Sequence, residues 1–482
     1  MTWTSNQSIA HASIQLSILA RGDRRLEAET YLMSGYQIRQ QVENGALPTS
    51  TAGKLARIWQ PPRLAGIQVE QQDGVPFLTA TQVFDIRPKA RKWLAPGRTP
   101  DLRERFVEPG WILVTCSGIV GDATISHAPH RGVIISHDLL RVQPSQEEDR
   151  GYLYCFFRSR YGRPMMQSSK YGNLIKHLEP EHVEELPVPL VDANIKHQLQ
   201  KGVDRVFSLR DQAFSLVEEA DRKYVEGLGL KAPPFGHQNA YKVAASELFE
   251  EGRRLDGFYY NPDAQIADHA LKECGYPVIR LLSATQEIFG TARFKHVYAT
   301  KGIPYVDSED LFKVNPQLEK FIPPQAKKNA EGYFVKRDWL LMAVSGQIYG
   351  INGSVVLADL NLENKVISNH VVRIVPKPDG MLPGYLQVAL SHPTFGRPLA
   401  VRLAFGTEVP EIAPEDIARI PVVKPPKALE EELAGLIDKA RALRSEADAL
   451  ENQTVGWLEE LLEPDLGPSA GLGGLSQSHD AE

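Results

Sequence analysis

Two segments of the chain carry apolar residues at the spacing of an amphipathic α-helix. In the later segment a leucine recurs every seven residues from Leu429 to Leu450, and apolar residues stand four positions after most of these leucines. The earlier segment, from Ile195 to Ala220, has similar spacing. This a/d pattern predicts two long helices that pack on each other. The residues that we expect in their seam are Leu199, Val206, Leu209, Ala213, Leu216, Leu433, Leu436, Leu443, Ala447 and Leu450.

The two helical segments are also copies of each other. Val203–Leu216 aligns with Ile437–Leu450 without a gap. The repeat continues outside the helices, where Gly74–Pro88 matches Gly302–Pro316. The distance along the chain between matched positions changes little from one match to the next, which indicates a tandem duplication with few and short insertions.

Each copy combines strands and short helices ahead of its long helix. Trp111–Gly118 and Trp339–Gly346 are apolar runs that end in Ser-Gly, which is typical of a strand followed by a turn. The predicted fold class is α+β, with two tandem, pseudo-twofold-related domains separated by two long helices that form an antiparallel coiled coil. The predicted parts are a first domain over residues 1–190, a first long helix over 191–228, a linker over 229–240, a second domain over 241–424, a second long helix over 425–463 and a disordered tail over 464–482.

Glycine interrupts the first helical segment at two places. Gly202 and Gly227 stand where the second copy has Leu436 and Leu461. Glycine has no side chain to pack and loses more backbone freedom on folding than any other residue. We therefore expect looser packing or fraying at these two positions.

Composition limits the class of protein. The 482 residues suffice for two or more domains, and no stretch approaches the roughly 20 apolar residues of a membrane helix. The N-terminus has no basic region ahead of its weakly apolar part, which disfavours a secretory signal. The three cysteines, Cys116, Cys155 and Cys274, are far apart and follow no metal-binding spacing. We therefore expect a cytoplasmic protein without a metal site.

The charge of the chain is unevenly distributed. The formal net charge is −6, but 13 acidic and four basic residues lie from Lys427 onward, so that residues 1–426 sum to +3. A dense basic run extends from Arg87 to Arg105 within this mildly basic body. The distribution is compatible with a nucleic-acid partner on the body, away from the acidic second helix.

The order of these parts resembles the specificity subunit of type I restriction-modification systems, or the equivalent subunit of a related methylation-associated phage-defence system. The resemblance covers about Ser13 to Leu462. It is carried by the repeated strand that ends in Ser-Gly, by the Ile-Ser-x-x-φ-φ-Arg strand at Ile135–Arg141 and Ile367–Arg373, and by the Leu-Pro-Val or Ile-Pro-Val exit into each long helix. The acidic second helix departs from the family pattern.

The resemblance implies two target-recognition domains that each read half of a bipartite duplex DNA sequence. It implies a non-catalytic chain without a cofactor of its own, because S-adenosylmethionine would bind to partner DNA adenine methyltransferase subunits, of which we expect two. A restriction or translocase subunit would add cleavage. A helix of about 33 residues spans about 50 Å. That length separates half-sites by one to one and a half turns of B-DNA.

Candidate DNA contacts are cations, hydroxyls and amides on predicted loops. Cations bind phosphates, and Arg, Lys and Asn are suited to base edges. For any single cation the alternative is a solvated charged loop, and for the Ser-Gly pairs it is a plain turn. The candidates are Arg87, Lys89, Arg91, Lys92, Arg98, Arg103, Arg105, Ser117, Lys170, Tyr171, Asn173, Lys320, Lys327, Lys328, Ser345, Arg402 and Thr407.

Two other classes of function remain open from the sequence. One is a coiled-coil protein-interaction scaffold without DNA specificity, and the other is a nuclease that acts alone. The chain contains no G-x-x-x-x-G-K-S/T loop, no G-x-G-x-x-G fingerprint, no Asn-Pro-Pro-Tyr-like methyltransferase motif and no H-E-x-x-H motif. Salt-sensitive binding to a bipartite duplex would exclude the scaffold, and metal-dependent cleavage by the purified chain would identify a nuclease.

Overall fold

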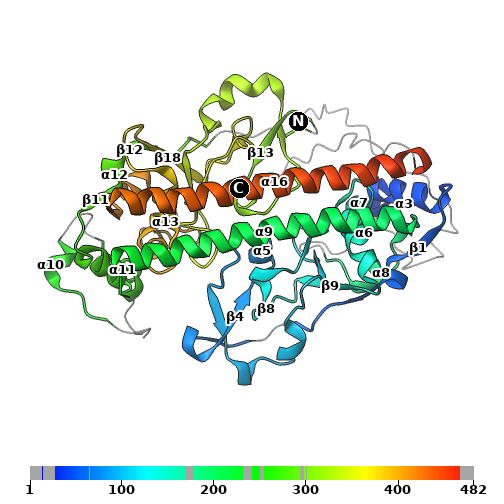
Figure 1. The fold of residues 1–482 in the computed structure, drawn as a ribbon, viewed down its shortest axis with the longest axis horizontal. Coiled ribbons are helices and arrows are strands. Elements are labelled where there is room, and N and C mark those ends of the chain that lie inside the picture. Colours follow the sequence, from blue (N-terminus) through cyan, green and yellow to red (C-terminus); the bar gives the residue numbers. More distant parts are fainter. Residues whose placement is uncertain are drawn as a thin grey trace, which may run out of the picture.

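Two long helices run side by side through the middle of the molecule, and a mixed α/β unit packs against each (Figure 1). The helices are α9, Ala193–Leu228, and α16, Lys427–Leu466. We call residues 28–189 the first unit and residues 241–423 the second unit. The computed structural model describes residues 14, 28–63, 66–169, 177–231, 241–249, 254–293, 298–299 and 301–466.

The first unit contains three small sheets, with strand orders β1-β10, β2-β9-β6-β7 and β3-β5-β4-β8. Its strands are β1 Thr49–Thr51, β2 Ala56–Trp59, β3 Gln68–Val69, β4 Val75–Leu78, β5 Lys92–Leu94, β6 Ile112–Thr115, β7 Ala123–Ile125, β8 Ile134–Ile135, β9 Leu139–Pro144 and β10 Pro187–Pro189. Its α-helices are α2 Ala28–Leu32, α3 Ser34–Asn44, α4 Ala52–Leu55, α5 Ala80–Val83, α6 Glu147–Arg158, α7 Gly162–Ser169 and α8 Pro180–Glu184. Its 3-10 turns are η1 Gln71–Asp73, η2 Pro96–Arg98, η3 Leu102–Arg105 and η4 Ala128–His130.

The second unit repeats this arrangement, with strand orders β11-β19, β12-β18-β15-β16 and β14-β13-β17. Its strands are β11 Val278–Arg280, β12 Thr285–Phe289, β13 Ile303–Val306, β14 Phe321–Ile322, β15 Leu340–Ala343, β16 Val355–Leu357, β17 Val366–Ile367, β18 Val371–Pro376 and β19 Pro421–Val423. Its helices are α10 Ala245–Leu248, η5 Gly257–Tyr260, α11 Pro262–Glu273, α12 Leu281–Ala284, η6 Asp310–Phe312, η7 Pro324–Tyr333, α13 Pro383–Ser391, α14 Arg397–Val401 and α15 Pro414–Ile417.

Strand register shows how closely the two units correspond. Phe77 pairs with Ile134 in a parallel ladder in the first unit, and Tyr305 pairs with Val366 in the same way in the second. The sequence repeat aligns Phe77 with Tyr305 and Ile134 with Val366, so equivalent residues make equivalent pairs. Where β3 pairs Val69 with Trp93 in the first unit, the second unit has an isolated antiparallel bridge between Ala299 and Phe321.

The arginine of the Ile-Ser-x-x-φ-φ-Arg strand has a structural role in both units. Arg141 and Arg373 are fully buried. Arg141 donates to the carbonyls of Ser136 and Ile135 at 2.8 and 2.9 Å. Arg373 makes the equivalent contacts with the carbonyls of residues 368 and 367 at 3.0 and 2.7 Å. The guanidinium group thus satisfies the backbone of the turn before its own strand, because buried carbonyls need donors.

The two long helices are antiparallel. Arg205 of α9 lies 3.1 Å from Glu446 of α16, whereas Lys223, farther along α9, pairs with Glu432, which is earlier in α16. Asp192 caps α9 by accepting from the backbone amide of residue 195. The sequence predicted helices over 191–228 and 425–463, and α16 continues through Pro464 to residue 466. Residues 467–482 of the predicted tail lie outside the described part.

Both units share their apolar cores with both helices. The core of the first unit includes the first half of α9 and the second half of α16, and the core of the second unit includes the opposite halves. All ten predicted seam residues are buried or partly buried. Each unit is therefore anchored along half the length of the helix pair, and this packing supplies most of the stability of the long helices.

The expectation of loose packing at two glycines of α9 is wrong. A Cβ atom on Gly202 would lie 2.8 Å from the hydroxyl of Thr454, and one on Gly227 would lie 2.6 Å from a methyl group of Leu429. The helices approach each other closely at these positions, and glycine is what leaves room for the residue opposite.

The two units also meet each other at the centre of the molecule. The amide of Ile86 donates to the carbonyl of Phe312, and the amide of Val314 donates to the carbonyl of Phe84, each at 2.8 Å. Asp85 thereby pairs antiparallel with Lys313, its equivalent in the repeat. We call residues 84–87 and 312–315 the central bridge.

Candidate nucleic-acid interface

The start of the predicted basic run points into the protein. Arg87 donates to the carbonyl of Ser391 at 3.2 Å and pairs with Asp221 of α9. Lys89 lies 2.6 Å from Glu218, also on α9. Burial lowers the pKa of Arg87. The chain's own carboxylates neutralise these cations, so we correct the prediction that Arg87 and Lys89 face DNA.

Two further arginines of the run are also committed to internal contacts. Arg91 donates to the carbonyl of Gly350 and to the hydroxyl of Ser354, both in the second unit. Arg105 is fully buried and donates to the carbonyls of Pro100 and Pro62 at 2.9 and 3.0 Å. Both side chains hold loops together, and we remove them from the candidate DNA contacts for that reason.

Three residues of the run remain at the surface. Arg98 and Arg103 are exposed on the 3-10 turns that follow β5. The ammonium group of Lys92 lies 5.5 Å above the ring of Tyr349 in the second unit, where it makes a cation–π contact. Arg98 and Arg103 are therefore the members of the run that are placed to reach a phosphate.

A hairpin beside the Ser-Gly turn of the second unit gathers other predicted residues. Phe405 and Glu411 exchange backbone hydrogen bonds of 3.0 and 2.9 Å, and Gly406 turns with a φ of +124°. Ser345 forms a bridge with Glu411, which attaches the Ser-Gly turn to the base of the hairpin. Thr407 is exposed near the tip. The fold thus brings together residues that are far apart in the sequence.

Arginines stand beside the exposed aromatic ring of this hairpin. The Phe405 side chain is 53% exposed. The guanidinium of Arg254 lies 5.4 Å from that ring and 5.2 Å from the ring of Tyr259, and Arg402 lies 5.2 Å from the same Tyr259 ring. Arg254 also pairs with Asp256 at 2.6 Å and donates to the carbonyl of Leu403 at 3.1 Å, so it holds the hairpin in place. The exposed ring of Phe405 suits stacking on a base.

A further arginine completes this surface. Arg293 lies 3.2 Å from Glu411, and its side chain is 77% exposed. An exposed ion pair of this kind is weak, so a phosphate can compete for the arginine. We call Arg254, Arg293, Arg402, Phe405 and Thr407 the hairpin surface.

The first unit has an equivalent turn. Ser117 forms a bridge with His177, which is the counterpart of the bridge between Ser345 and Glu411. The alignment that matches the two long helices without a gap also places Tyr171 at the position of Phe405. The predicted contacts Lys170, Tyr171 and Asn173 all lie outside the described residues.

The remaining predicted cations belong to the second unit. Lys320 lies 2.6 Å from Asp307 and is about half exposed, with its ammonium group 5.5 Å from the ring of Tyr298. Lys327 and Lys328 lie on η7, and their side chains are outside the described part. These three lysines thus lie on elements other than the hairpin surface.

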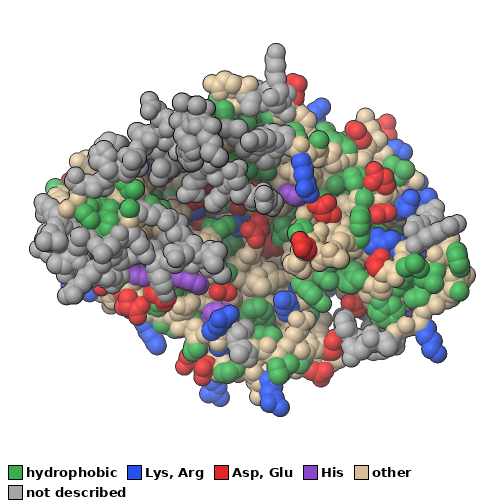
Figure 2. All heavy atoms as spheres, turned by 180° about the vertical axis from the view of Figure 1, so that it is seen from behind, with side chains coloured by type: hydrophobic (Ala, Val, Ile, Leu, Met, Phe, Trp, Pro, Cys, Tyr) green, Lys and Arg blue, Asp and Glu red, His purple; other side chains and the backbone are tan. Residues whose placement is uncertain are grey.

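The visible charges do not form one broad basic patch. On the face shown in Figure 2, Lys and Arg side chains are dispersed singly and in small groups among acidic and apolar ones. The described part of this face therefore offers small local sites of positive charge.

Comparisons with known proteins give likenesses among solved structures. No protein-family model matches the chain, and no curated protein matches its sequence. The chain is similar to the type I restriction-modification S subunit from M. genitalium, with 13% identity and a TM-score of 0.32, covering 88% of this chain and 97% of that one. It is similar to the HsdS subunit from Thermoanaerobacter tengcongensis, with 13% identity and a TM-score of 0.25, covering 88% and 97%.

A smaller part of the chain is similar to the type IIG restriction endonuclease BpuSI, with 12% identity and a TM-score of 0.26. That likeness covers 36% of this chain and 28% of the endonuclease. Likenesses at these identities and TM-scores carry no argument about function, so the function is inferred from the contacts within the chain.

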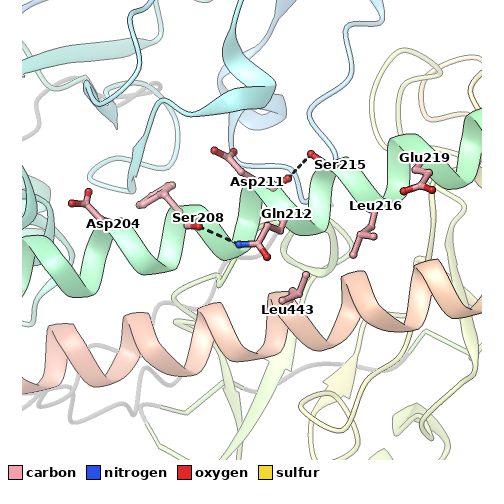
Figure 3. A pocket seen from close by; sticks show the side chains of 9 residues that line it. Asp204, Ser208, Asp211, Gln212, Ser215, Leu216, Glu219 and Leu443 are labelled. Atoms are coloured by element: carbon pink, nitrogen blue, oxygen red, sulfur yellow. Dashed lines mark hydrogen bonds between the residues drawn. The ribbon is translucent and has the colours of Figure 1, made fainter.

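The exposed side of the helix pair carries an acidic groove of about 660 Å³ (Figure 3). Leu216 of α9 and Leu443 of α16 point toward each other at its floor, and Asp204, Asp211 and Glu219 are spaced along α9. These carboxylates are between 38% and 55% exposed. Asp204 pairs with Arg150 at 2.8 Å, and Asp211 lies 2.6 Å from His127. The groove therefore offers a basic protein surface the exposed parts of these two carboxylates and Glu219.

Sequence reasoning missed two members of the hairpin surface. Arg254 was visible only as part of the repeat, and Arg293 lies in a loop without a recognisable pattern. Only the fold brings them to the hairpin of Phe405. The sequence repeat does point to Phe405 as the counterpart of Tyr171, but it does not show which arginines lie near that ring.

The described residues contain no group of three or more His, Cys, Asp or Glu side chains placed to hold a metal ion. No helix among them is long and apolar enough to cross a membrane. His130 is buried against the carbonyl of Val83, and burial lowers its pKa to about 3.

Proposed function

We propose that this chain is the non-catalytic DNA-specificity subunit of a type I restriction-modification system or of a related methylation-associated defence system. Each unit would act as a target-recognition domain that reads one half of a bipartite duplex sequence. The observation that carries the proposal is the repetition of the same sheet order, with an equivalent bridge at the Ser-Gly turn, in two units anchored along one antiparallel helix pair.

The hairpin surface supplies the chemistry of recognition in the second unit. Arg293 and Arg402 provide cations for phosphates or guanine edges, and Phe405 provides an exposed ring. Arg254, which pairs with Asp256 and donates to the carbonyl of Leu403, supports that ring. In the first unit we assign the same role to Lys170, Tyr171 and Asn173, which the sequence predicts as DNA contacts. Arg98 and Arg103 add exposed charge near that unit's sheet of β3, β4, β5 and β8.

The helix pair sets the scale of the target in this proposal. The 36 residues of α9 span about 54 Å at 1.5 Å per residue, and B-DNA advances about 3.4 Å per base pair. Sites at the two ends of the pair would lie one to one and a half turns apart and on a similar face of the duplex. The two helices would serve as an antiparallel coiled coil between two recognition domains.

The acidic groove is the proposed docking site for methyltransferase subunits. The approximate twofold relation of the repeat favours two such subunits, and a restriction or translocase subunit would complete a system that cleaves. The target adenine would be flipped out by the methyltransferase, which would also bind S-adenosylmethionine. Placing the partner on carboxylates keeps it away from the DNA-facing surfaces of the units.

Selection from a random duplex pool tests this function. The full chain, purified with the subunits that accompany it, should enrich a bipartite sequence with a fixed spacer, and binding should weaken steeply with salt. Enrichment of no sequence, or purification without a methyltransferase, would contradict the proposal and favour a scaffold. Metal-dependent cleavage by the chain alone would contradict its non-catalytic role.

A further inference from the structure

The central bridge adds a second connection between the units, besides the helix pair. If the helix pair were the only connection, each unit would touch the helices and not the other unit. The backbone hydrogen bonds of Ile86 and Val314 join the units directly, and they do so at positions that are equivalent in the repeat. The contact therefore lies where an approximate twofold axis would pass between the units.

Side chains on one side of the bridge extend this contact between the units. Arg158 of α6 donates to the carbonyl of Asn315 at 3.0 Å, and Gln317 donates to the carbonyl of Arg158 at 2.6 Å. Arg163 lies 2.6 Å from Glu319 of the second unit. Arg158 is 7% exposed, so these hydrogen bonds are shielded from water and are worth more than surface contacts.

The other side of the bridge is held in the same way by different residues. Arg87 reaches the carbonyl of Ser391 in the second unit, and Arg91 reaches the carbonyl of Gly350 and the hydroxyl of Ser354. First-unit side chains thus contact the loop after β15 and the end of α13. Contacts on both sides of the bridge oppose tilting of one unit against the other.

One buried carboxylate ties the bridge to both helices. Glu451 of α16 accepts from both terminal nitrogens of Arg210 on α9 at 2.9 Å, and from Asn315 of the bridge at 2.5 Å. Arg158 lies 3.4 Å away, and the hydroxyl of Tyr154 also donates to this carboxylate. Four parts of the molecule, namely α6, α9, α16 and the bridge, therefore converge on one group that is 2% exposed.

We propose that the central bridge, with Arg91 and Gln317 beside it, fixes the spacing and rotational phase of the two half-sites together with the helix pair. This inference rests on the proposed function. One base pair more or less moves a half-site by about 3.4 Å and turns it by about one tenth of a helical turn. If the two units cannot tilt against each other, the protein binds half-sites separated by one spacer length. If the bridge is loosened, it also binds half-sites whose spacer is one base pair shorter or longer.

The test compares methylation in cells that express the full chain with its methyltransferase. The ratio of methylation at the native spacer to methylation at spacers one base pair shorter or longer is read from the genome. In the double variant Arg91→Ala/Gln317→Ala this ratio should fall by about tenfold or more, the scale of a lost specificity determinant. The matched control Arg205→Ala removes an exposed pair between the helices and should leave the ratio unchanged.

Amide hydrogen exchange on the purified chain reports on the bridge without DNA. The amides of Ile86 and Val314 should exchange faster in the double variant than in the wild type, while protection along α9 is retained. Faster exchange with an unchanged spacer ratio would overturn the inference and leave the proposed function intact. Absence of any bipartite methylation in wild-type cells would instead overturn the proposed function.

A covalent variant tests the same idea in the opposite direction. Asp85 and Lys313 face each other across the bridge, and opposed residues of an antiparallel pair lie within the reach of a disulfide. The double variant Asp85→Cys/Lys313→Cys should form this disulfide and, when oxidised, bind duplex DNA with the native spacer preference. Loss of DNA binding on oxidation, with recovery on reduction, would show that the units must separate and would overturn the inference.

Discussion

Equivalent arginines of the two long helices make different contacts. Arg210 of α9 is held by both oxygens of Glu451, whereas Arg444 of α16 donates to the carbonyl of Ile86 at 3.1 Å. The cause lies in the repeat itself, because the position equivalent to Glu451 is occupied by Val217. The charges of the two halves are therefore arranged differently: Glu451 of α16 collects arginines on one side, and Asp221 of α9 pairs with Arg87 on the other.

The pKa values of the two arginines follow this difference. Burial alone would lower both, but the charge of Glu451 raises the pKa of Arg210 above its usual value. The pKa of Arg444 is lowered to about 10 by burial and by the neighbouring Arg87. The comparison teaches that a duplicated fold keeps its backbone while the charges at its junction diverge, so that the two halves should respond differently to the same kind of substitution.

Among these substitutions, Glu451→Ala should lower the free energy of unfolding the most. Removing the carboxylate leaves Arg158 buried without its ion-pair partner and leaves Arg210 with Asp448 alone, 3.0 Å away, which costs about 3–5 kcal/mol for a broken buried pair. Urea denaturation measures the change. The matched control is Glu446→Ala, whose carboxylate is 54% exposed, and it should stay within about 0.5 kcal/mol of the wild type. Equal effects of the two substitutions would contradict the importance of the buried charges.

The same carboxylate predicts a pH dependence of the free energy of unfolding. The arginines hold the pKa of Glu451 well below its usual range. A depressed carboxyl pKa stabilises the fold above the ordinary glutamate pKa of about 4.3 and ceases to do so as pH falls toward the folded value. The stability difference between wild type and Glu451→Gln should therefore be largest near neutrality and shrink below about pH 4. A difference that grows on acidification would contradict this assignment.

Two equivalent glycines lie at positions where both halves pack a short helix closely against a long one. A Cβ atom on Gly151 of α6 would lie 2.5 Å from the Cα atom of Gln200 on α9, and one on Gly384 of α13 would lie 2.8 Å from the Cα atom of Ala434 on α16. Alanine at either position forces helix backbones apart and should cost about 1–3 kcal/mol. Thermal unfolding of Gly151→Ala and Gly384→Ala should show similar losses.

The control for these glycines lies on the same helix pair. A Cβ atom on Gly456 would meet nothing within 4 Å, so Gly456→Ala should stabilise the helix by about 0.5–1 kcal/mol. A loss in only one of the Gly151 and Gly384 variants would show that the packing of the halves has diverged as their charges have.

Substitutions on the hairpin surface should have the smallest effect on stability, but they should change DNA recognition. Phe405→Ala should relax the selected base preference in one half-site and leave the other unchanged, because the first unit is unaltered. Arg293→Ala should weaken binding to all sequences. It should also reduce, by about 1, the slope of the logarithm of the binding constant against the logarithm of the salt concentration. Duplex selection and binding at several salt concentrations measure both. Loss of preference in both half-sites would contradict the division of labour between the units.

The sequence was informative where the duplication repeats a pattern. The heptad leucines and the ten seam residues could be found because an apolar period of 3.5 requires a partner helix, and the recurring Ser-Gly strands indicated the sheets. Charge was harder to place. Arg87 and Lys89 look like surface cations in the sequence, and only the packing of the first unit against α9 shows their carboxylate partners.

Close approach was also invisible in the sequence. Gly202 and Gly227 look like weaknesses of a helix when read alone, because the reason for glycine lies in Thr454 and Leu429 on another helix. The central bridge is hidden for the same reason, since neither Asp85 nor Lys313 belongs to a strand of its own unit.

Methylome sequencing of the host, with and without this chain, tests the central claim most directly. The account predicts one bipartite adenine-methylation motif, with a fixed spacer, that disappears when the chain is deleted and returns when it is restored. A methylome that is identical in the two strains, measured with the methyltransferase genes intact and expressed, would contradict it.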